Sequence, residues 1–453
     1  MMRSMFSGVS GLKAHQAKMD VIGNNVANVN TLGFKAGRVT FQEIFNQTLR
    51  GAGAPDAATA RGGTNPMQIG LGIAVGSIDN QMTGGSPQRT DNPTDLSISG
   101  DGFFIVKGST ADTFKFTRAG NFGLDKLGNL VSGDGMNVYG WTKYETLGDG
   151  TVKFDTETPI GPINLYSDAT NGNKKIIAAK ATTYAEFSGN LNSAYATKAT
   201  TDTTAQFTVP FTIYDSLGNA HELNVNFRKT DSSLTIPVTN PDGTTGTQPA
   251  TQWTYNISDK AGNSVSTAEG TVIFDSKGKL VVGDTTSPEQ AVLNFDPGAG
   301  SGTDKIDITL DFKKLTQYAA DSSVKPSNVN GYTTGNLVTF NVGSDGMLTG
   351  VYSNGQQQPL GLIALAGFDN PAGLQKVGGN LFIPTTNSGD FIKGVPAGSQ
   401  GVGTLSPGTL EMSNVDLSRE FTDMIITQRG FQANSRIITT SDEMLQELVN
   451  LKR

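Results

Sequence analysis

Hydrophobic residues recur at seven-residue intervals near both ends of the chain. This spacing keeps them on one face of a helix, so the sequence predicts a long amphipathic helix at each end. The second helix is expected to begin near Leu417 and, at about 1.5 Å per residue, to be roughly 50 Å long. The predicted helix-packing residues are Met5, Leu12, Met19 and Val26 at the N-terminus, and Leu417, Phe421, Met424, Phe431, Ile438 and Leu445 at the C-terminus.

Each predicted helix needs a partner along its apolar stripe, because an isolated helix is only marginally stable in water. Either the other end of the chain or neighbouring copies of the chain can supply this partner. A second line of Ile437, Met444 and Leu451 widens the apolar face of the C-terminal helix. The stripes therefore favour assembly with other copies over catalysis.

Between its ends the chain alternates apolar and polar residues, which is the period of a β-strand. Residues 69–165 combine short strand patterns with tight turns: Phe103–Val106 is an apolar run bounded by glycines, and Phe114, Phe116, Phe122 and Leu124 alternate with polar residues. A second β region begins near Lys174, where the alternation at 207–213 and 223–227 predicts a hairpin. We expect this second region to be a β-sandwich or a barrel.

The order of these segments predicts a fold that is mainly β with terminal α-helices, in which an outer β domain is inserted in a loop of an inner one. The helices form a coiled-coil region from the two ends of the chain. The predicted limits are residues 1–33 and 413–453 for the terminal helices, 34–68 and 394–412 for a linker region, 69–170 and 316–393 for the inner β domain, and 171–315 for the outer β domain.

Glycine and proline mark the predicted breaks between these elements. Gly33 is expected to end the first helix, since a glycine often follows the last helical turn. Two segments rich in glycine, proline and small residues, Gly51–Pro66 and Gly394–Gly408, predict extended connectors. Thr239–Thr251 is expected to be an exposed loop.

Composition excludes several classes of protein. Charged residues make up 17% of the 453 residues, below the usual ~25%. The net charge is -7, and the sequence contains no cluster of lysines and arginines. This argues against nucleic acid or an anionic membrane as partner. Cysteine is absent, which excludes disulfides and cysteine metal sites. No run of 18 apolar residues and no cleavable signal-peptide pattern is present, so we expect a cytoplasmic protein or one exported with its N-terminus intact.

The polar motifs predict no catalytic, cofactor-binding or metal site. Asp125, Asp215 and Asp275 each begin an Asp-x-x-Gly segment, which favours a hairpin turn because the further oxygen ligands of a calcium loop are missing. The only histidines, His15 and His221, have no catalytic partner near them in the sequence. We therefore expect that the protein is not an enzyme and binds no cofactor, metal ion or small-molecule substrate.

An asparagine-rich stretch closes the predicted N-terminal helix, although asparagine is a mediocre helix former. One interpretation is a frayed, hydrated helix end. The other is that these amides bind neighbouring subunits, with polar residues of the C-terminal helix as their counterparts. The candidate contact residues are Asn24, Asn25, Asn28 and Asn30 in the first helix, and Gln428, Arg429 and Asn434 in the second.

Several of these segments resemble the axial proteins of the bacterial flagellar rod and hook. The resemblance rests on Ser10–Lys35, which contains the run Asn24-Asn25-Val26-Ala27-Asn28, and on Ser413–Leu417 with Gln428–Asn434. Ser99–Val106 and Phe116–Phe122 are similar to the β domain that rod and hook members share. Ile213–Leu223 resembles the second β domain of the hook members, whereas Phe431 stands where members often carry tyrosine.

This resemblance implies a structural subunit of a helical polymer, the curved hook that acts as a universal joint and transmits torque from rod to filament. The terminal helices would then form its inner tube. It also implies an extracellular location on the flagellum, reached by type III export without a cleaved signal peptide. The implied partners are further copies of the chain, a distal rod protein, a hook cap, a hook–filament junction protein and the export apparatus. A distal rod subunit and a secreted β-rich adhesin are the alternatives.

Overall fold

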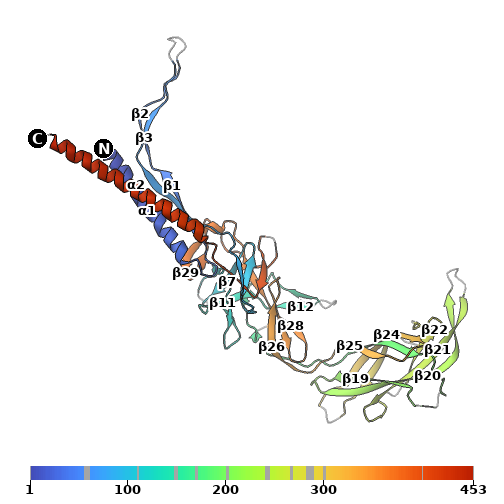
Figure 1. The fold of residues 1–453 in the computed structure, drawn as a ribbon. Coiled ribbons are helices and arrows are strands. Elements are labelled where there is room, and N and C mark those ends of the chain that lie inside the picture. The colour runs from blue at the N-terminus through green and yellow to red at the C-terminus, as the bar shows by residue number, and fades with distance from the viewer. Residues whose placement is uncertain are drawn as a thin grey trace. The chain divides into compact units, whose positions relative to one another are not determined.

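The computed structural model describes residues 2–55, 62–109, 112–146, 151–168, 172–199, 202, 204–239, 245–265, 269–281, 290–298, 302–399 and 401–451. The chain forms two compact units, which Figure 1 shows with their elements labelled. The first unit consists of Met1–Lys174, Thr339–Gly350 and Gln358–Arg453. The second consists of Lys175–Val338 and Val351–Gln357.

Two long helices in the first unit come from the two ends of the chain. They are α1 (Met2–Ala27) and α2 (Leu417–Asn450), as the stripes predict. Asp416 caps α2 by accepting hydrogen bonds from the backbone N–H groups of Ser418 and Arg419. The prediction that Gly33 ends α1 is wrong, because the helix ends at Ala27. Gly33 instead lies in the following turn with φ +64°, which a glycine adopts without strain.

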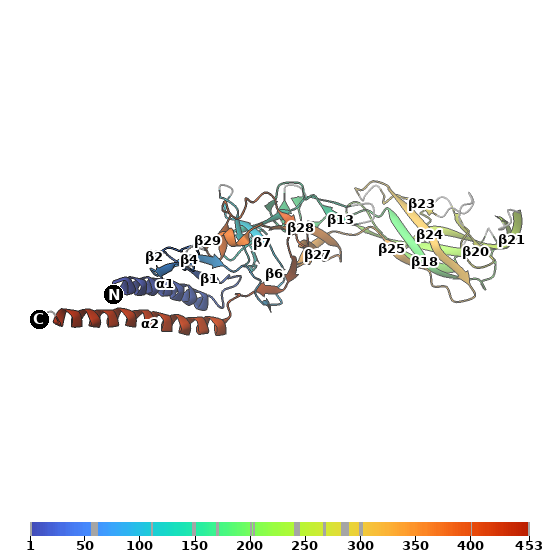
Figure 2. The same ribbon diagram turned by 90° about the horizontal axis from the view of Figure 1, so that it is seen from above.

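A ribbon of antiparallel strands follows α1. β1 (Gly37–Glu43) pairs with β4 (Ile73–Asn80), and β2 (Asn46–Arg50) pairs with β3 (Met67–Gly70). Figure 2 shows α1 between this ribbon and α2. The described part of the predicted connector Gly51–Pro66 therefore lies within a hairpin arm, where Gly53 and Thr64 form a bridge, and does not separate helix from sheet.

An antiparallel sheet forms the body of the first unit. Its strands follow the order β27-β28-β11-β7-β8-β30-β29. These strands are β27 (Met347–Tyr352), β28 (Gln357–Ala366), β11 (Asn137–Trp141), β7 (Phe103–Lys107), β8 (Lys115–Thr117), β30 (Leu381–Ile383) and β29 (Gln375–Gly378). β28 comes late in the chain but pairs with β11 and β7, so the C-terminal part of the chain returns to the sheet that the N-terminal part began.

Short strands surround this sheet. They are β9 (Gly123–Leu124), β10 (Leu130–Val131), β12 (Tyr144–Thr146), β13 (Val152–Phe154), β14 (Gly161–Pro162), β15 (Ser167–Asp168), β16 (Gly172–Asn173) and β31 (Val395–Pro396), with the 3-10 helix η1 (Pro371–Gly373). Alternate residues of the central strands, including Phe103, Ile105 and Phe116, point into one core with Trp141 and Phe382. Two further residues of β7, Phe104 and Val106, are buried as well, so both faces of this strand are covered.

Two strand pairs connect the sheet to the start of α2. β6 (Leu96–Ser99) pairs with β32 (Thr404–Pro407), and β5 (Pro87–Arg89) pairs with β33 (Thr409–Glu411). The prediction of a free connector at Gly394–Gly408 is therefore wrong for its described residues. Val395 and Leu405 form backbone ladders with β28 and β6, and these ladders hold the segment on the body of the unit.

The second unit is a β-sandwich. One sheet has the order β23-β24-β18-β25 and the other has the order β19-β20-β21-β22. The strands are β18 (Tyr184–Asn192), β19 (Phe207–Tyr214), β20 (Ala220–Thr239), β21 (Thr245–Asp259), β22 (Gly270–Asp275), β23 (Gln290–Phe295), β24 (Ile306–Tyr318) and β25 (Lys325–Val329). β17 (Ile176–Ile177) pairs with β26 (Gly335–Val342). The ring of Phe187 on β18 contacts that of Phe211 on β19 across the two sheets, and the buried Trp253 belongs to the same core.

Two expectations about the outer region change. Thr245–Thr251 lies in β21, paired with β20, so the predicted loop Thr239–Thr251 is wrong for these residues, and 240–244 lie outside the described residues. Residues 316–338, assigned from sequence to the inner domain, lie in the second unit. The reason is that β24 continues to Tyr318 and β25 pairs with β18.

The predicted Asp-x-x-Gly turns are confirmed. In each of the three, the glycine N–H donates to the aspartate carbonyl, and the glycine has a positive φ of 77° to 89°. In the turn at Asp215 the carboxylate accepts hydrogen bonds from the backbone N–H groups of Leu217 and Asn219 and from the Asn219 side chain. These donors occupy the carboxylate oxygens that a calcium ion would need.

Candidate assembly interface

The two terminal helices pack against each other through small residues. They are antiparallel, since Lys18 Nζ lies 3.1 Å from Asp423 Oδ1 and Ser4 Oγ lies 3.5 Å from Ser441 Oγ. A side chain at Gly11 would lie 2.7 Å from Asn434 Oδ1, and one at Gly430 would lie 2.8 Å from the His15 ring. Glycine at these two positions leaves room for the Asn434 and His15 side chains of the opposite helix.

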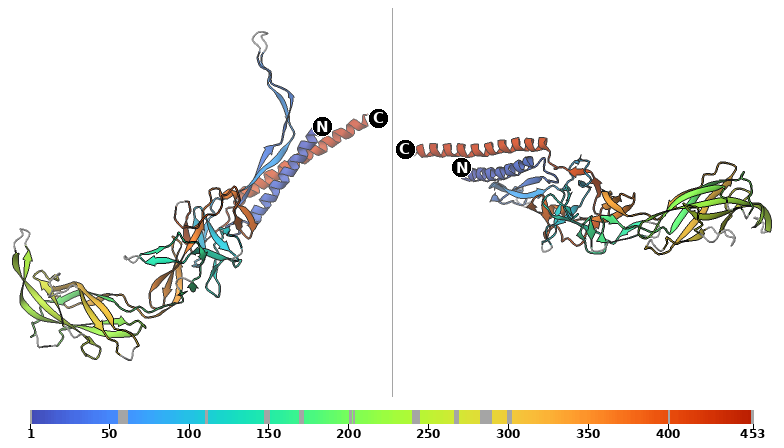
Figure 3. Two further views of the ribbon diagram at one scale, coloured as in Figure 1. Left: turned by 180° about the vertical axis from the view of Figure 1, so that it is seen from behind. Right: turned by 90° about the horizontal axis from the view of Figure 1, so that it is seen from below.

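α2 continues beyond the start of α1. Ser441 is the α2 residue that faces Ser4, and Figure 3 shows the C-terminal end of α2 beyond the N-terminal end of α1. The apolar side chains in this extension are exposed, including Met444 at 47%, Leu448 at 51% and Val449 at 71%. The last turns of α2 therefore have no packing partner on α1.

Much of the predicted apolar stripe faces away from the helix pair. Leu417, Phe421 and Phe431 are 38%, 50% and 41% exposed. The remaining predicted residues are half-buried. They are Met5, Leu12, Met19, Val26, Met424, Ile438 and Leu445. The fully buried positions of α1 are instead Gly8, Gly11, Ala14, Ile22 and Asn25. The helix pair therefore buries small residues and Ile22 fully, whereas Leu417, Phe421 and Phe431 keep more than a third of their surface exposed.

The predicted polar contact residues divide into two groups. Asn25 is 2% exposed, and its side chain donates to Glu420 on α2 (3.2 Å). Asn434 is half-buried, and its amide donates to the Gly430 carbonyl (2.9 Å). The second group contains the exposed residues, which are Asn24, Asn30, Gln428 and Arg429, together with the half-buried Asn28.

In the second group, the side-chain hydrogen bonds that the structure shows join residues three or four positions apart. Asn28 donates to Asn24 Oδ1 (2.7 Å) and accepts from Thr31 Oγ1 (3.0 Å), and Arg429 donates to Gln432 (3.2 Å). These side chains leave much of their surface open at the helix exterior. They are therefore available to a neighbouring chain, whereas Asn25 and Asn434 are engaged inside their own chain.

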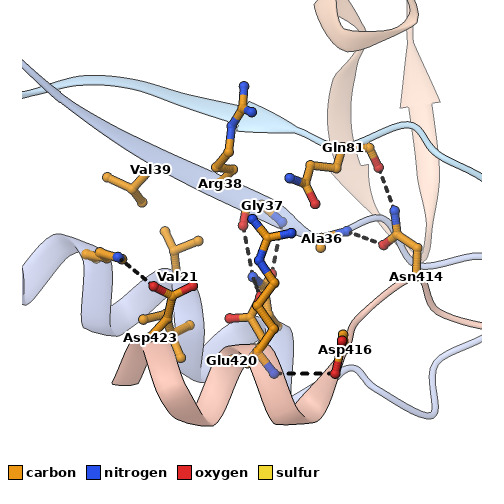
Figure 4. Close-up of a pocket in the computed structure, with 14 residues that line it drawn as sticks. Val21, Ala36, Gly37, Arg38, Val39, Gln81, Asn414, Asp416, Glu420 and Asp423 are labelled. Carbon is orange, nitrogen blue, oxygen red and sulfur yellow. Dashed lines mark hydrogen bonds and ion pairs between the residues drawn. The ribbon is translucent and has the colours of Figure 1, made fainter. Parts of the chain in front are cut away.

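A polar pocket of about 250 Å³ lies where α1, β1 and the start of α2 meet. Figure 4 shows the Asn414 carboxamide at its rim, where Nδ2 donates to the Gln81 carbonyl and Oδ1 accepts from the Ala36 N–H, both at 2.8 Å. The residues that line the pocket carry both charge signs. The cations are Lys18, Arg38 and Arg419, and the carboxylates are Asp416, Glu420 and Asp423. Burial, and then the nearby Asp423, raise the pKa of Glu420 above its ordinary value, although the hydrogen bond from Asn25 opposes this rise.

A buried ionic cluster beside this pocket was not predicted from the sequence. Glu411 accepts from Lys35 Nζ at 2.6 Å and from Arg118 Nη1 at 3.2 Å, and all three side chains are at most 3% exposed. Lys35 and Glu411 lie 376 positions apart in the chain. No local pattern connects them, so only the folded chain could identify the cluster.

The described residues contain no group of three or more metal-ligating acidic or histidine side chains. Among the same residues, neither helix is long and apolar enough to cross a membrane. His221 Nε2, on β20, lies 3.3 Å from Asp215 Oδ2, and the ring of His15 on α1 faces Gly430 of α2. The conspicuous surface of the first unit is thus the apolar exterior of the helix pair.

Family models match four segments of the chain. They are the flagella basal body rod protein (residues 5–35), the flagellar hook protein FlgE/F/G D1 domain (97–173), the flagellar basal body protein FlaE D2 domain (178–332) and the flagellar basal body rod FlgEFG protein C-terminal model (406–451). These matches define the class of the protein. It is an axial structural protein of the bacterial flagellum, with the rod and hook proteins as its relatives.

Full-length comparisons identify the family within this class. The flagellar hook protein FlgE of Treponema pallidum is 40% identical over 100% of both chains. The flagellar basal-body rod protein FlgG of Bacillus subtilis is 30% identical, also over 100% of both chains. The crystal structure of Helicobacter pylori flagellar hook protein FlgE2 matches in fold with a TM-score of 0.50 at 15% identity, covering 72% of this chain and 100% of that one. The chain belongs to the flagellar hook protein family.

Proposed function

We propose that the chain polymerises head to tail into the curved flagellar hook. The observation that carries this proposal is the apolar face of α2, where Leu417, Phe421 and Phe431 are 38%, 50% and 41% exposed. Burying such a face releases roughly 25 cal/mol for each Å² removed from water, so neighbouring copies that cover it would be stabilised. A heterologous contact of this kind produces an open helical polymer.

The terminal helices are then the inner tube of the polymer and the β units are its outer layers. The exposed polar residues of the helices, such as Asn24, Gln428 and Arg429, would bind neighbouring copies. The low charge content leaves few ion pairs to fix the outer contacts, which supports sliding between copies while the tube bends and transmits torque.

The remaining parts of the proposal concern location and partners. The subunit would leave the cell through the flagellar type III apparatus without cleavage, and would lie outside the cell between rod and filament. Its partners there would be a distal rod protein, a hook cap and a hook–filament junction protein. The family and its full-length matches support this assignment over a distal rod subunit or an adhesin.

The test compares polymerisation of the purified chain with that of two variants. Phe421→Asp combined with Phe431→Asp places charges on the exposed face of α2. We expect this double variant to lose sedimentable polymer while the thermal unfolding of its β units stays unchanged. Ile392→Asp is the matched control, because Ile392 is 91% exposed but lies outside the helices, and it should polymerise normally.

Electron microscopy of the polymer then separates the candidate functions. Tubes of variable curvature are expected for a hook, whereas straight tubes would favour a rod subunit. Normal polymerisation of the double variant would contradict the proposed role of the α2 face. A chain that remains monomeric under all conditions would contradict polymerisation itself.

A further inference from the structure

Glu411 is the meeting point of three segments that lie far apart in the sequence. Lys35 belongs to the segment that follows α1, Glu411 ends β33 just before α2, and Arg118 follows β8 of the body sheet. The carboxylate uses one oxygen for Lys35 (2.6 Å) and the other for Arg118 (3.2 Å). One anion therefore connects both terminal helices to the β body.

The cluster is buried, and two cations contact its one carboxylate. Lys35 Nζ also donates to the Thr83 carbonyl (2.8 Å), and the Gly85 N–H donates to Glu411 Oε1 (2.9 Å). Burial lowers the pKa of Lys35, although Glu411 opposes this change. A buried charge that loses its partner is strongly unfavourable, so removal of the Glu411 charge would leave Lys35 and Arg118 without their carboxylate.

Backbone contacts hold the same segments together. The Gly33 N–H donates to the Glu411 carbonyl (2.8 Å), and a side chain at Gly33 would lie 2.7 Å from the Ala119 nitrogen. Asn414 accepts from the Ala36 N–H (2.8 Å). The segment that leaves α1 and the segment that enters α2 therefore lie against each other and against the Arg118–Ala119 backbone.

We propose that Glu411 is a positioning residue that couples the docking of the two terminal helices. The segments 33–36 and 409–414 become ordered on the β body together, because neither can close the ionic cluster without the other. All the contacts behind this coupling lie within one chain.

Hydrogen exchange of the full-length monomer tests the coupling. In Glu411→Gln, amides at 33–36 and at 409–414 should both exchange at least tenfold faster than in the unaltered chain, and by similar factors. Faster exchange at 409–414 alone would overturn the proposal, because it would mean that Glu411 stabilises only its own segment. Absence of protection at both segments in the unaltered chain would also overturn it, since the closed cluster must protect both.

A second variant, Lys35→Met, tests the coupling from the other segment if Glu411→Gln does not fold. Lys35→Met alters the other segment, and it should accelerate exchange at 409–414 as well as at 33–36; an effect confined to 33–36 would contradict the coupling. Glu420→Gln is the matched control, since it makes the same chemical change at the start of α2 and retains an acceptor for Asn25. Exchange at 33–36 should not change in this control.

Discussion

The Asn25 side chain hydrogen-bonds both backbone groups of Gly37, its N–H and its carbonyl. Its Nδ2 donates to the Gly37 carbonyl (2.8 Å), and the Gly37 N–H donates to its Oδ1 (2.9 Å). The same amide donates to Glu420 on α2. One side chain of α1 thus satisfies the first residue of β1 and contacts the second helix, which fixes where the strand ribbon begins relative to the helix pair.

Replacement of Asn25 by alanine should loosen this junction. The change leaves two backbone groups of Gly37 without partners, at a cost of about 2 kcal/mol. We expect the Gly37 amide to exchange about thirtyfold faster, as measured by hydrogen exchange. Asn24→Ala is the control, because Asn24 is exposed at the adjacent position; an equal effect of the two changes would contradict the proposed role of Asn25.

Alanine substitutions at two glycines of α1 should have opposite effects. At Gly11 the added Cβ would lie 2.7 Å from Asn434 Oδ1, so the Asn434 side chain must move from its hydrogen bond with Gly430 and α1 should lose protection from exchange. At Gly23 nothing lies within 4 Å, and alanine should stabilise the helix by up to about 1 kcal/mol. Stabilisation by both changes would mean that the glycine contact does not hold the helices together.

His15 should make the helix pair sensitive to acid. Burial, and then the charge of Lys18, lower its pKa below the ordinary 6.5. The unfolded chain therefore takes up a proton at a higher pH than the folded chain, so stability is complete above about pH 6.5 and decreases as the pH falls below it. Nuclear magnetic resonance titration of the ring and exchange of α1 amides at pH 7.5 and 5.5 would measure this. His15→Gln should remove most of the pH dependence between these values.

Asp215 should stabilise the sandwich at all but strongly acidic pH. Burial opposes its ionisation, but hydrogen bonds from Asn219, His221 and Leu217 outweigh burial and lower its pKa to about 2. Its contribution, about 2 kcal/mol, is present above pH 3.8 and is lost as the pH falls toward 2. Asp215→Asn should lower the thermal midpoint of the second unit at pH 7 and reduce its acid dependence between these values.

The related turn at Asp125 provides a comparison for this prediction. Its carboxylate accepts the same pattern of hydrogen bonds from Leu127 and Asn129, and its pKa is also lowered, first by the Asn129 side chain. Asp215 has a fully buried side chain and an additional contact to His221. Asp125→Asn should therefore cost less than Asp215→Asn, and the reverse order would contradict the role given to burial.

Local patterns predicted the terminal helices and many strands, but not β1 and β2, which lie in the segment 34–68 expected to be a linker. The seven-residue period predicted α1 and α2, and the period of two predicted those strands, because each period follows from burial of one face of an element. The Asp-x-x-Gly turns were predicted correctly for a similar reason, since Asp215 and Asn219 satisfy the turn within five residues. The segments 51–66 and 394–408 were misjudged because glycine and proline describe backbone freedom, whereas ladders with distant strands fixed these backbones.

The sequence by itself determined the helices, many strands, the turns and the membership of a flagellar family, since all of these are encoded in neighbouring residues or in short motifs. Only the tertiary structure decided which face of each helix is buried. A heptad stripe identifies apolar residues but not their partner, and here glycines bring the helices together while Phe421 and Phe431 stay outside. The junction of Asn25 with Gly37 and the cluster of Lys35, Arg118 and Glu411 likewise depend on contacts between segments that the chain brings together only by folding.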